Sequence, residues 1–318
     1  MLPVMAYFLG LDAGGTKTVC ALAAEEAVLG RATGGPIKIL RVPLEEAEKN
    51  LAELLQTVSA RSGISLQSIT RTCIGLSGGS VPRIADWTLH ALQKHVSGEI
   101  LLAGDEEVAL DGAFPGSAGV LVVAGTGSNM IGRTTAGQLI HVGGWGPVVA
   151  DEGSGNWIGR QAVRAIFDAL DHEEMTQLLP EVLDQWKLPN IGSLIDLSNQ
   201  TPGPNFSALT PIVALCAGQG DPYAKRVLDQ AGTLLGTYAV LTVRRLQKFE
   251  KRCPEIAFTG SVLQHVSAVN EAMRAAILRE LPAARILPEA IDPVQGALWR
   301  ARQLQMPVDS HVIRFPRR

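Results

Sequence analysis

The chain has 318 residues, of which 46% are hydrophobic and 19% are charged. Because a single hydrophobic core rarely grows beyond roughly 250–300 residues, this length and composition predict two lobes, each with its own core. The formal net charge is −3 and no long run of Lys or Arg occurs, so we do not expect a nucleic acid as a partner.

The sequence predicts a soluble, cytoplasmic protein that does not insert into a membrane. Its apolar start lacks a basic segment and a cleavage site of small residues, so it is typical of a strand rather than of a signal peptide. No stretch approaches the roughly 18–20 apolar residues that a membrane span needs. The four cysteines lie far apart without a paired spacing, which is typical of reduced thiols rather than of a metal site.

Residues 1–116 are predicted to form an α/β lobe. It opens with three β-rich runs, separated by glycine turns or charged pairs, which indicate an antiparallel meander. These runs cover residues 7–11, 18–24 and 28–33. Apolar residues at helical spacing predict a helix over 44–61. Strands over 71–76 and 99–103 flank a helix over 87–96, a crossover of the kind that joins parallel strands.

A glycine-rich turn, Gly14-Gly15-Thr16-Lys17, follows the first strand. Glycine N–H groups can approach a phosphate closely, and the threonine hydroxyl adds a donor. A P-loop would place the lysine directly after the last glycine and lead into a helix, whereas the residues after Lys17 are typical of a strand. The sequence therefore favours a β-hairpin that holds phosphate groups, with an ordinary hairpin as the alternative.

Two aspartates follow strands of this lobe. Asp12 ends the first strand, where a carboxylate near phosphate oxygens suits Mg²⁺ that keeps its waters; a turn-capping aspartate is the alternative. Asp105 follows the strand that ends at Ala103, at the edge where α/β sheets bind their ligands. We predict that Asp105 is a general base. It is also a good N-cap for the following helix, and both roles can hold.

Residues 117–299 are predicted to form a second, more helical lobe. Its strands cover residues 120–124, 130–133, 139–142 and 255–258, and its helices cover residues 154–170, 175–186, 207–217 and 222–249. A closing helix is expected over 292–305. The segment from about 300 to 318 is predicted to return to the N-terminal lobe.

A second glycine turn, Gly125-Thr126-Gly127, leaves the first strand of this lobe. Each lobe therefore begins with a strand, a glycine turn and a second strand, which is a weak internal repeat. The repeat predicts two similar lobes that face one cleft, with Thr126 and Gly127 as further phosphate-binding residues.

A third cluster combines glycines, an indole and carboxylates in the segments 143–146 and 151–154. An indole face can pack on a sugar ring while carboxylates accept hydrogen bonds from its hydroxyls. Gly144, Trp145 and Asp151 are therefore candidate sugar-binding residues. Core packing of the indole and helix capping by the aspartate are the alternatives.

The segment 75–79 satisfies the pattern G-x-S-x-G, which is the nucleophile elbow of α/β-hydrolases. Ser77 would be the nucleophile, and His265 or His311 could complete a triad. This alternative is remote, because the pattern is short and leaves both glycine turns unexplained.

These motifs together resemble those of the BadF/BadG/BcrA/BcrD-type ATPase and N-acetylglucosamine kinase family, within the actin, hexokinase and Hsp70 ATPase superfamily. The likeness covers nearly the whole chain. It implies an α/β fold of two ribonuclease H-like lobes, each a mixed sheet with an antiparallel meander and flanking helices, with an ATP cleft between them. It also implies that 12–18 and 125–129 bind phosphates, that Asp105 is catalytic, and that Gly260 and Ser261 lie on the adenosine side.

By the same resemblance, Ser77, Gly78 and Thr126 line the sugar side. The chain lacks the cysteine-rich zinc motif of repressor-type sugar kinases and the paired cysteines of dehydratase-activator ATPases. Amino-sugar kinases of this type tend to have an asparagine that reaches the sugar, at the place where this chain has Lys38. Lysine is longer and charged, so it could block the sugar pocket, contact an acidic group or point to solvent.

The expected function is Mg-ATP-dependent phosphorylation of an amino sugar, with O6 of N-acetylglucosamine as the acceptor. Asp105 would accept the hydroxyl proton, while the glycine turns, Thr16 and Lys17 would stabilise charge on the phosphoryl group. The main alternative is an ATPase switch or activator without a sugar acceptor. The oligomeric state stays open, and a homodimer is compatible with the sequence.

Overall fold

The computed structural model describes residues 5–76, 81–250 and 252–303. They form two compact units: unit 1 combines the described parts of Met1–Ser117 and Ile291–Arg318, and unit 2 is the described part of Ala118–Ala290. The chain thus returns to unit 1 at Ile291, earlier than the sequence suggested. None of the helices in the described residues combines the length and apolarity needed to cross a bilayer.

Unit 1 is built on a five-stranded sheet in the order β3-β2-β1-β4-β5. Its strands are β1 (Tyr7–Ala13), β2 (Thr18–Ala23), β3 (Val28–Gly34), β4 (Ile69–Leu76) and β5 (Glu99–Ala103). The first three form an antiparallel meander, whereas β1, β4 and β5 run parallel. The carboxyl ends of these parallel strands share one edge of the sheet, where the polar residues after them come together.

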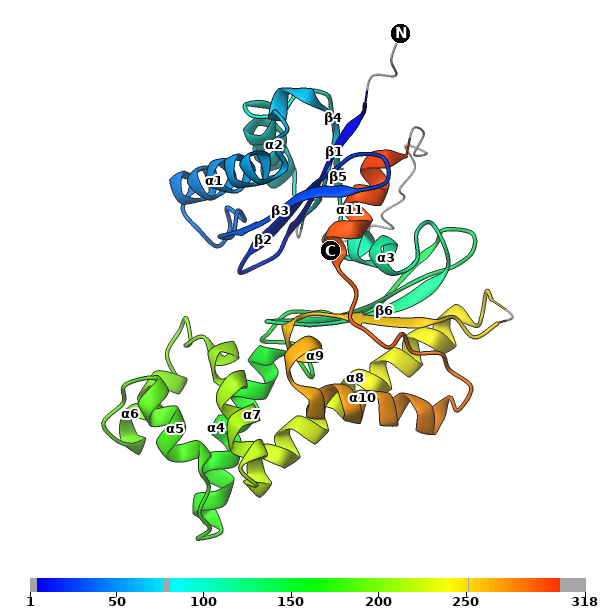
Figure 1. The fold of residues 1–318 in the computed structure, drawn as a ribbon. Helices are drawn as coiled ribbons and strands as arrows, with labels where there is room; N and C mark the ends of the chain where they lie inside the picture. Colours follow the sequence, from blue (N-terminus) through cyan, green and yellow to red (C-terminus); the bar gives the residue numbers. More distant parts are fainter. Residues whose placement is uncertain (1–4, 77–80, 251, 304–318) are drawn as a thin grey trace. The chain divides into compact units, whose positions relative to one another are not determined.

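Helices cover both faces of this sheet (Figure 1). They are α1 (Leu44–Ser62), α2 (Pro82–Gln93), α3 (Asp105–Ala113) and α11 (Pro293–Arg302), and a short 3₁₀ turn, η1 (Leu66–Ser68), precedes β4. Alternate residues of β1 serve the two faces: Leu9 and Leu11 join the core under α1 and α2, and Phe8 joins the core under α3 and α11. Helix α1 forms because its buried residues recur at helical spacing, and it ends at Gly63, whose φ is +69°.

Unit 2 carries a four-stranded sheet in the order β8-β7-β6-β9. Its strands are β6 (Gly119–Ala124), β7 (Ser128–Arg133), β8 (Leu139–Gly143) and β9 (Ile256–Thr259). The first three are antiparallel neighbours and β9 pairs parallel with β6. Each unit therefore has a meander followed by a parallel strand, so the two units are similar, as the repeat in the sequence predicted.

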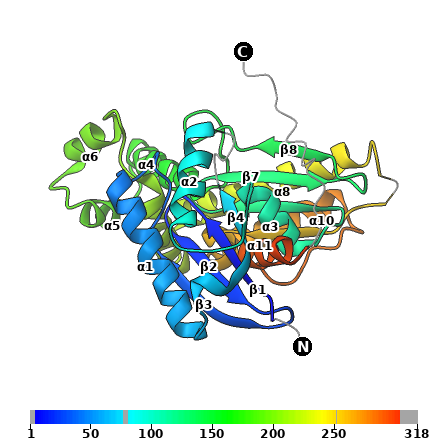
Figure 2. The same cartoon turned by 90° about the horizontal axis from the view of Figure 1, so that it is seen from above.

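The helices of unit 2 enclose a large apolar core against this sheet. They are α4 (Gly155–Asp171), α5 (Leu178–Gln185), α6 (Ile191–Ser198), η2 (Phe206–Leu209), α7 (Thr210–Gly218), α8 (Pro222–Leu246), α9 (Ser261–His265) and α10 (Ser267–Glu280). Helices α8 and α10 run side by side in both views (Figure 1 and Figure 2). This packing leaves the turns after β6 and β9 at the carboxyl edge of the sheet.

Candidate active site

In unit 1, Asp12 and Asp105 lie at the carboxyl ends of parallel strands. The register places Asp12 of β1 opposite Gly75 of β4, and Gly75 opposite Ala103 of β5. Asp105 follows two residues later as the first residue of α3, and Gly104 is the N-cap. Topology thus brings together two carboxylates that are 93 positions apart in the sequence.

Burial raises the pKa of both carboxyl groups. The pKa of Asp12 rises to about 7, because the group is desolvated and because Asp105 and Asp292 are negative; Lys17 and Arg31 lower it. The pKa of Asp105 rises to about 6 through burial and the charge of Glu106. The hydrogen bond from the N–H of Glu106 and the charge of the Lys38 ammonium lower it in part. A carboxylate with a pKa just below neutrality is well suited to accept a proton from a hydroxyl.

One oxygen of Asp105 is held in place. Its Oδ1 accepts a hydrogen bond of 3.1 Å from the N–H of Glu106 in the first turn of α3. The positive end of the helix dipole also favours the charged form. The capping and catalytic interpretations of this residue are therefore compatible, although Gly104 occupies the N-cap position itself.

Asp12 has the chemistry of a magnesium ligand. Burial and, after it, the charges of Asp105 and Asp292 raise its pKa, so a divalent cation would offset a charge that the fold otherwise disfavours. Asp292 already accepts hydrogen bonds from both terminal nitrogens of the Arg31 guanidinium, and the one from Nη2 to Oδ1 is 3.0 Å long. Among the described residues no group of three His, Cys, Asp or Glu could hold a metal ion. Mg²⁺ commonly takes most of its ligands from phosphate oxygens and water, so a single carboxylate such as that of Asp12 fits this mode of binding.

The first glycine turn is a β-hairpin. Ala13 of β1 pairs with Thr18 of β2, and a strand rather than a helix follows Lys17, so the predicted hairpin is confirmed and the turn is not a P-loop. A Cβ on Gly15 would lie 3.3 Å from Nη1 of Arg41, and a Cβ on Gly14 would lie 3.2 Å from the carbonyl oxygen of Lys17. The hairpin is therefore closed tightly and has a guanidinium against its tip.

In unit 2, the second glycine turn packs against the first turn of α4. The N–H of Gly155 donates to the carbonyl of Gly125 at 2.7 Å, and the N–H of Asn156 donates to the carbonyl of Thr126 at 3.2 Å. The hydroxyl oxygen of Ser154 caps the helix by accepting from the N–H of Trp157 at 3.0 Å. The segment 125–127 is thereby fixed to a helix N-terminus, which is a common place for anions to bind.

The turn after β9 lies beside the turn after β6. Gly260 has φ of +101°, and a Cβ there would overlap the carbonyl of Ala124, so glycine is required. A Cβ on Gly125 would in turn lie 3.8 Å from Oγ of Ser261. Gly260 and Ser261 therefore lie next to the second glycine turn within one unit, at the start of α9.

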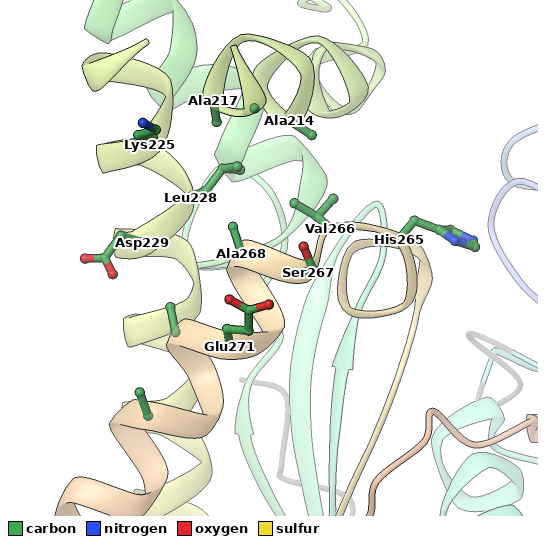
Figure 3. Close-up of a pocket in the computed structure, with 13 residues that line it drawn as sticks. Ala214, Ala217, Lys225, Leu228, Asp229, His265, Val266, Ser267, Ala268 and Glu271 are labelled. Atoms are coloured by element: carbon green, nitrogen blue, oxygen red, sulfur yellow. The ribbon is translucent and has the colours of Figure 1, made fainter. Parts of the chain in front are cut away.

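A cavity of about 650 Å³ opens beside α9, among helices α7, α8 and α10. Figure 3 shows Leu228, Val266 and Ala268 facing the space between the helices, whereas His265 points away from it. Ala214, Ala217 and other small residues form the apolar part of the lining, and Lys225, Asp229 and Glu271 add charged groups to it. Its volume lies in the range of small-molecule sites. No single stretch of sequence indicates this cavity, because its lining residues come from four helices.

The loop after β8 exposes apolar side chains. Trp145 is 67% exposed and Val148 is 82% exposed, so the core-packing alternative for the indole is wrong. Backbone hydrogen bonds nevertheless order this loop. The N–H of Trp145 donates to the carbonyl of Ala150 at 3.0 Å, and the N–H of Ala150 donates to the carbonyl of Gly146 at 3.0 Å. Gly144 permits the bend with φ of +71°. The indole is therefore presented to solvent by a defined turn.

Asp151 follows this loop and is buried, with 5% of its surface exposed. Ser154 and Asn156 donate hydrogen bonds to its carboxyl group, yet its Oδ2 has no partner. Burial raises the pKa of this group. Because Ser154 is the N-cap of α4, the capping alternative for Asp151 is wrong. A buried carboxylate oxygen with spare acceptor capacity suits a ligand hydroxyl.

Two predicted sugar-side residues, Ser77 and Gly78, lie outside the described residues, and so does the serine nucleophile of the hydrolase alternative. Two residues near the candidate site were not singled out by the sequence. Arg41 lies in a turn and its guanidinium is near Gly15. Asp292 is 280 positions from Asp12 and raises the pKa of that carboxyl group. An Asp-Pro pair at a helix start was the only local signal for Asp292.

The sequence and the fold of nearly the whole chain match those of known proteins. An N-acetylmuramic acid/N-acetylglucosamine kinase of Clostridium acetobutylicum is 29% identical over 307 residues, which cover 94% of this chain and 99% of that protein. A candidate N-acetylglucosamine kinase of Chromobacterium violaceum has a solved structure that is 26% identical, with a TM-score of 0.73, over 95% of this chain and 100% of that one.

The fold extends to more distant sugar kinases. The ROK hexokinase of Thermus thermophilus matches with a TM-score of 0.57 at 17% identity, over 93% of this chain and 97% of that one. The two mixed sheets, each with a meander, confirm the α/β fold that the resemblance implied, and this hexokinase shares that fold. A family profile covers residues 9–301. The chain belongs to the BadF/BadG/BcrA/BcrD ATPase family.

Proposed function

We propose that this protein is an ATP-dependent kinase that phosphorylates a hydroxyl of an amino sugar, with O6 of N-acetylglucosamine as the expected acceptor. The observation that carries the proposal is Asp105, a partly buried carboxyl group with a pKa of about 6 at the carboxyl edge of the parallel strands. The names of the relatives from C. acetobutylicum and C. violaceum support an amino sugar as the acceptor.

In the proposed reaction, Asp105 orients the acceptor hydroxyl and accepts its proton as the new O–P bond forms. Backbone N–H groups of the hairpin at Gly14 and Gly15, with Thr16 and Lys17, bind phosphate oxygens. When bound, Mg²⁺ would neutralise charge on the phosphate oxygens, and Asp12 would hold it through water. Positioning and electrostatic stabilisation carry most of the acceleration in such a transfer.

In unit 2, we propose that the 125–127 turn binds phosphate through Thr126 and Gly127, and that Gly260 and Ser261 contact the ribose. The cavity among α7, α8 and α10 then accommodates the base of the nucleotide, because it lies beside α9.

On the sugar side, Trp145 and Gly144 contact the ring. Oδ2 of Asp151 accepts a hydrogen bond from a sugar hydroxyl, which gives this buried oxygen the partner it otherwise lacks. Ser77 and Gly78 stay predicted sugar-side residues. The unpaired cysteines agree with a cytoplasmic enzyme.

The function is tested by measuring ADP release from Mg-ATP with a panel of acceptors: N-acetylglucosamine, N-acetylmannosamine, glucosamine, glucose and acidic sugars. We expect release to rise with an N-acetylated amino sugar and a phosphorylated sugar to form in equal amount. Release that does not depend on any sugar would instead support an ATPase switch. Covalent labelling of Ser77 by a serine-reactive probe would support a hydrolase.

Removing the metal is expected to stop the reaction. EDTA in excess should abolish sugar-dependent ADP release, and added Mg²⁺ should restore it. Asp12→Asn should raise the Mg²⁺ concentration for half-maximal rate by about 10-fold or more, because one carboxylate of a sparse donor set is lost. Asp86→Asn, an exposed position on α2, is the matched control and should behave as the unmodified enzyme. A full rate in EDTA would contradict the role of Asp12.

A further inference from the structure

The guanidinium of Arg41 lies against the tip of the first glycine hairpin. A Cβ on Gly15 would lie 3.3 Å from Nη1, 3.5 Å from Cζ and 3.7 Å from Nε of Arg41. In an edge-on contact the carbon would be farther away than both nitrogens, so the flat face of the guanidinium covers this glycine. Its N–H groups lie in that plane and therefore stay available beside the hairpin. This close approach depends on the missing side chain at Gly15.

The backbone at Arg41 is fixed by hydrogen bonds and packing. Its N–H donates to the carbonyl of Lys38 at 2.8 Å, which closes a turn just before α1. The segment that leads into this turn is anchored as well, because Nδ2 of Asn50 on α1 donates to the carbonyl of Pro36 at 2.8 Å. Ile37 is fully buried in the core under α1 and α2. The guanidinium therefore reaches the hairpin from a fixed point of the fold.

Within the described residues, no carboxylate forms an ion pair with Arg41, whose side chain is exposed. Arg71 of the same unit, in contrast, is bonded to Glu99 at 2.7 Å. Lys17, two positions after Gly15 in the hairpin, is also exposed and forms no ion pair in the described parts of the chain. Two cations without a paired carboxylate raise the positive potential at one tip, so the tip attracts an anion.

The hairpin determines which anion Arg41 can contact. Its backbone N–H groups, with Thr16 and Lys17, are proposed to bind the phosphate oxygens of ATP. Because the guanidinium is in contact with Gly15, an anion that it reaches is one that this hairpin holds. A guanidinium presents its N–H donors as a planar fork that matches two oxygens of a phosphoryl group. In the loose transition state of phosphoryl transfer, negative charge spreads over the oxygens that do not react, which strengthens this contact.

We propose that Arg41 is a further catalytic residue, whose guanidinium binds the phosphoryl group while it passes from ATP to the sugar hydroxyl. This inference rests on the proposed function. In that step the bond from the γ-phosphorus to the bridging oxygen breaks, and its electron pair leaves with ADP. The sugar oxygen forms the new O–P bond, and its proton passes to Asp105. Arg41 exchanges no proton; it contributes a positive charge and a pair of donors to the oxygens that do not react.

The first test compares the steady-state kinetics of Arg41→Gln, Arg41→Lys and the control Arg164→Gln. Arg164 is exposed on α4 and, among the described residues, forms no ion pair. We expect Arg41→Gln to lower kcat by about 10²-fold or more, because a fixed donor pair and its charge are lost from the transition state. The KM values for ATP and sugar should change little, since the contact strengthens only during transfer. Arg41→Lys keeps the charge without the fork and should fall between, whereas Arg164→Gln should match the unmodified enzyme.

Two further measurements have readouts that a purely structural role would not change. Added guanidinium ion, below the concentration that lowers the melting temperature, should restore part of kcat to Arg41→Ala, because the exposed position leaves room for it. Calorimetry should show that Arg41→Gln weakens the binding of ADP with aluminium fluoride, which mimics the phosphoryl group in transfer, by about 10-fold or more. Binding of ADP alone should not change.

Three results would contradict this role of Arg41. Unchanged kcat in Arg41→Gln would remove the residue from the reaction. An equal loss of affinity for ADP and for ADP with aluminium fluoride would assign it to holding the bound nucleotide. A rise in KM for the sugar alone would assign it to the acceptor. Absence of turnover with every sugar would refute the proposed function, whereas the calorimetric comparison would still decide on Arg41.

Discussion

Asp105→Asn is expected to lower kcat for sugar phosphorylation by about 10²–10³-fold while ATP still binds, because an amide cannot accept the hydroxyl proton. The change keeps the size of the side chain, and its oxygen can still accept the hydrogen bond from the N–H of Glu106. Steady-state rates of ADP release, with ATP binding measured separately, check this expectation. Asp86→Asn on the exposed face of α2 is the control for removal of one charge from unit 1.

The same variant should be more stable than the unmodified protein at pH 8. The pKa of Asp105 rises from 3.8 to about 6 on folding, so the folded state binds the proton more tightly and the free energy of unfolding falls as pH rises through this window. Asparagine removes that penalty, a gain of about 1–2 kcal/mol after allowance for solvent screening at a partly exposed group. The difference in melting temperature should disappear at pH 4.

A combined result decides the role of this residue. Lower kcat together with higher stability at pH 8 would identify a carboxylate that lowers the free energy of unfolding but is needed to accept the hydroxyl proton. Near-normal turnover would remove Asp105 from the mechanism. Lower stability at pH 8 would show that the carboxylate serves mainly to cap α3.

The elements that the sequence predicted well are those whose pattern is local. The meander β1–β3 has short β-rich runs between tight turns, and α1 has buried residues at positions 47, 51, 54, 55 and 58. Helix α10 was not predicted, although its buried residues Val269, Met273, Ala276 and Ile277 recur at helical spacing. Its close packing against α8 depends on Gly232 and Gly236 of that helix, which the local pattern of α10 does not show.

The same distinction applies to the candidate site. The glycine turns and Asp105 follow apolar strands, so a pattern of strand and turn was enough to find them. Asp292 and Arg41 have no such pattern, because what matters is their distance from Asp12 and Gly15 in the fold. Lys38 stood out as a departure from a family pattern, but the effects of Arg41 and Asp105 on its pKa depend on the fold and not on a local pattern.

Gly296→Ala is expected to destabilise unit 1 by at least about 3 kcal/mol, because α11 crosses α3 with backbone in contact with backbone. A Cβ on Gly296 would overlap the carbonyl oxygen of Val108 and would lie 2.5 Å from the backbone nitrogen of Gly112. No rotamer change relieves such a contact, so the helices must move apart. Urea unfolding and amide exchange of α3 and α11 measure the effect.

The separation would also break a buried ion network. Arg300 on α11 pairs with Asp111 at 2.5 Å and with Glu107 at 3.1 Å, and all three side chains are almost fully buried. Charges that lose a buried partner keep their desolvation cost, which is why the expected loss exceeds that of ordinary overpacking. Because α3 begins with Asp105, the folded fraction of the variant should also turn over more slowly.

Gly218→Ala is the matched control, since it adds the same methyl group to a helical glycine that has no heavy atom within 4 Å of the new Cβ. It should be neutral or stabilising by less than about 1 kcal/mol, as helix propensity predicts. If both variants unfold at the same urea concentration, α3 and α11 tolerate a wider spacing. The position of Asp105 would then depend on its own turn rather than on the helix crossing behind it.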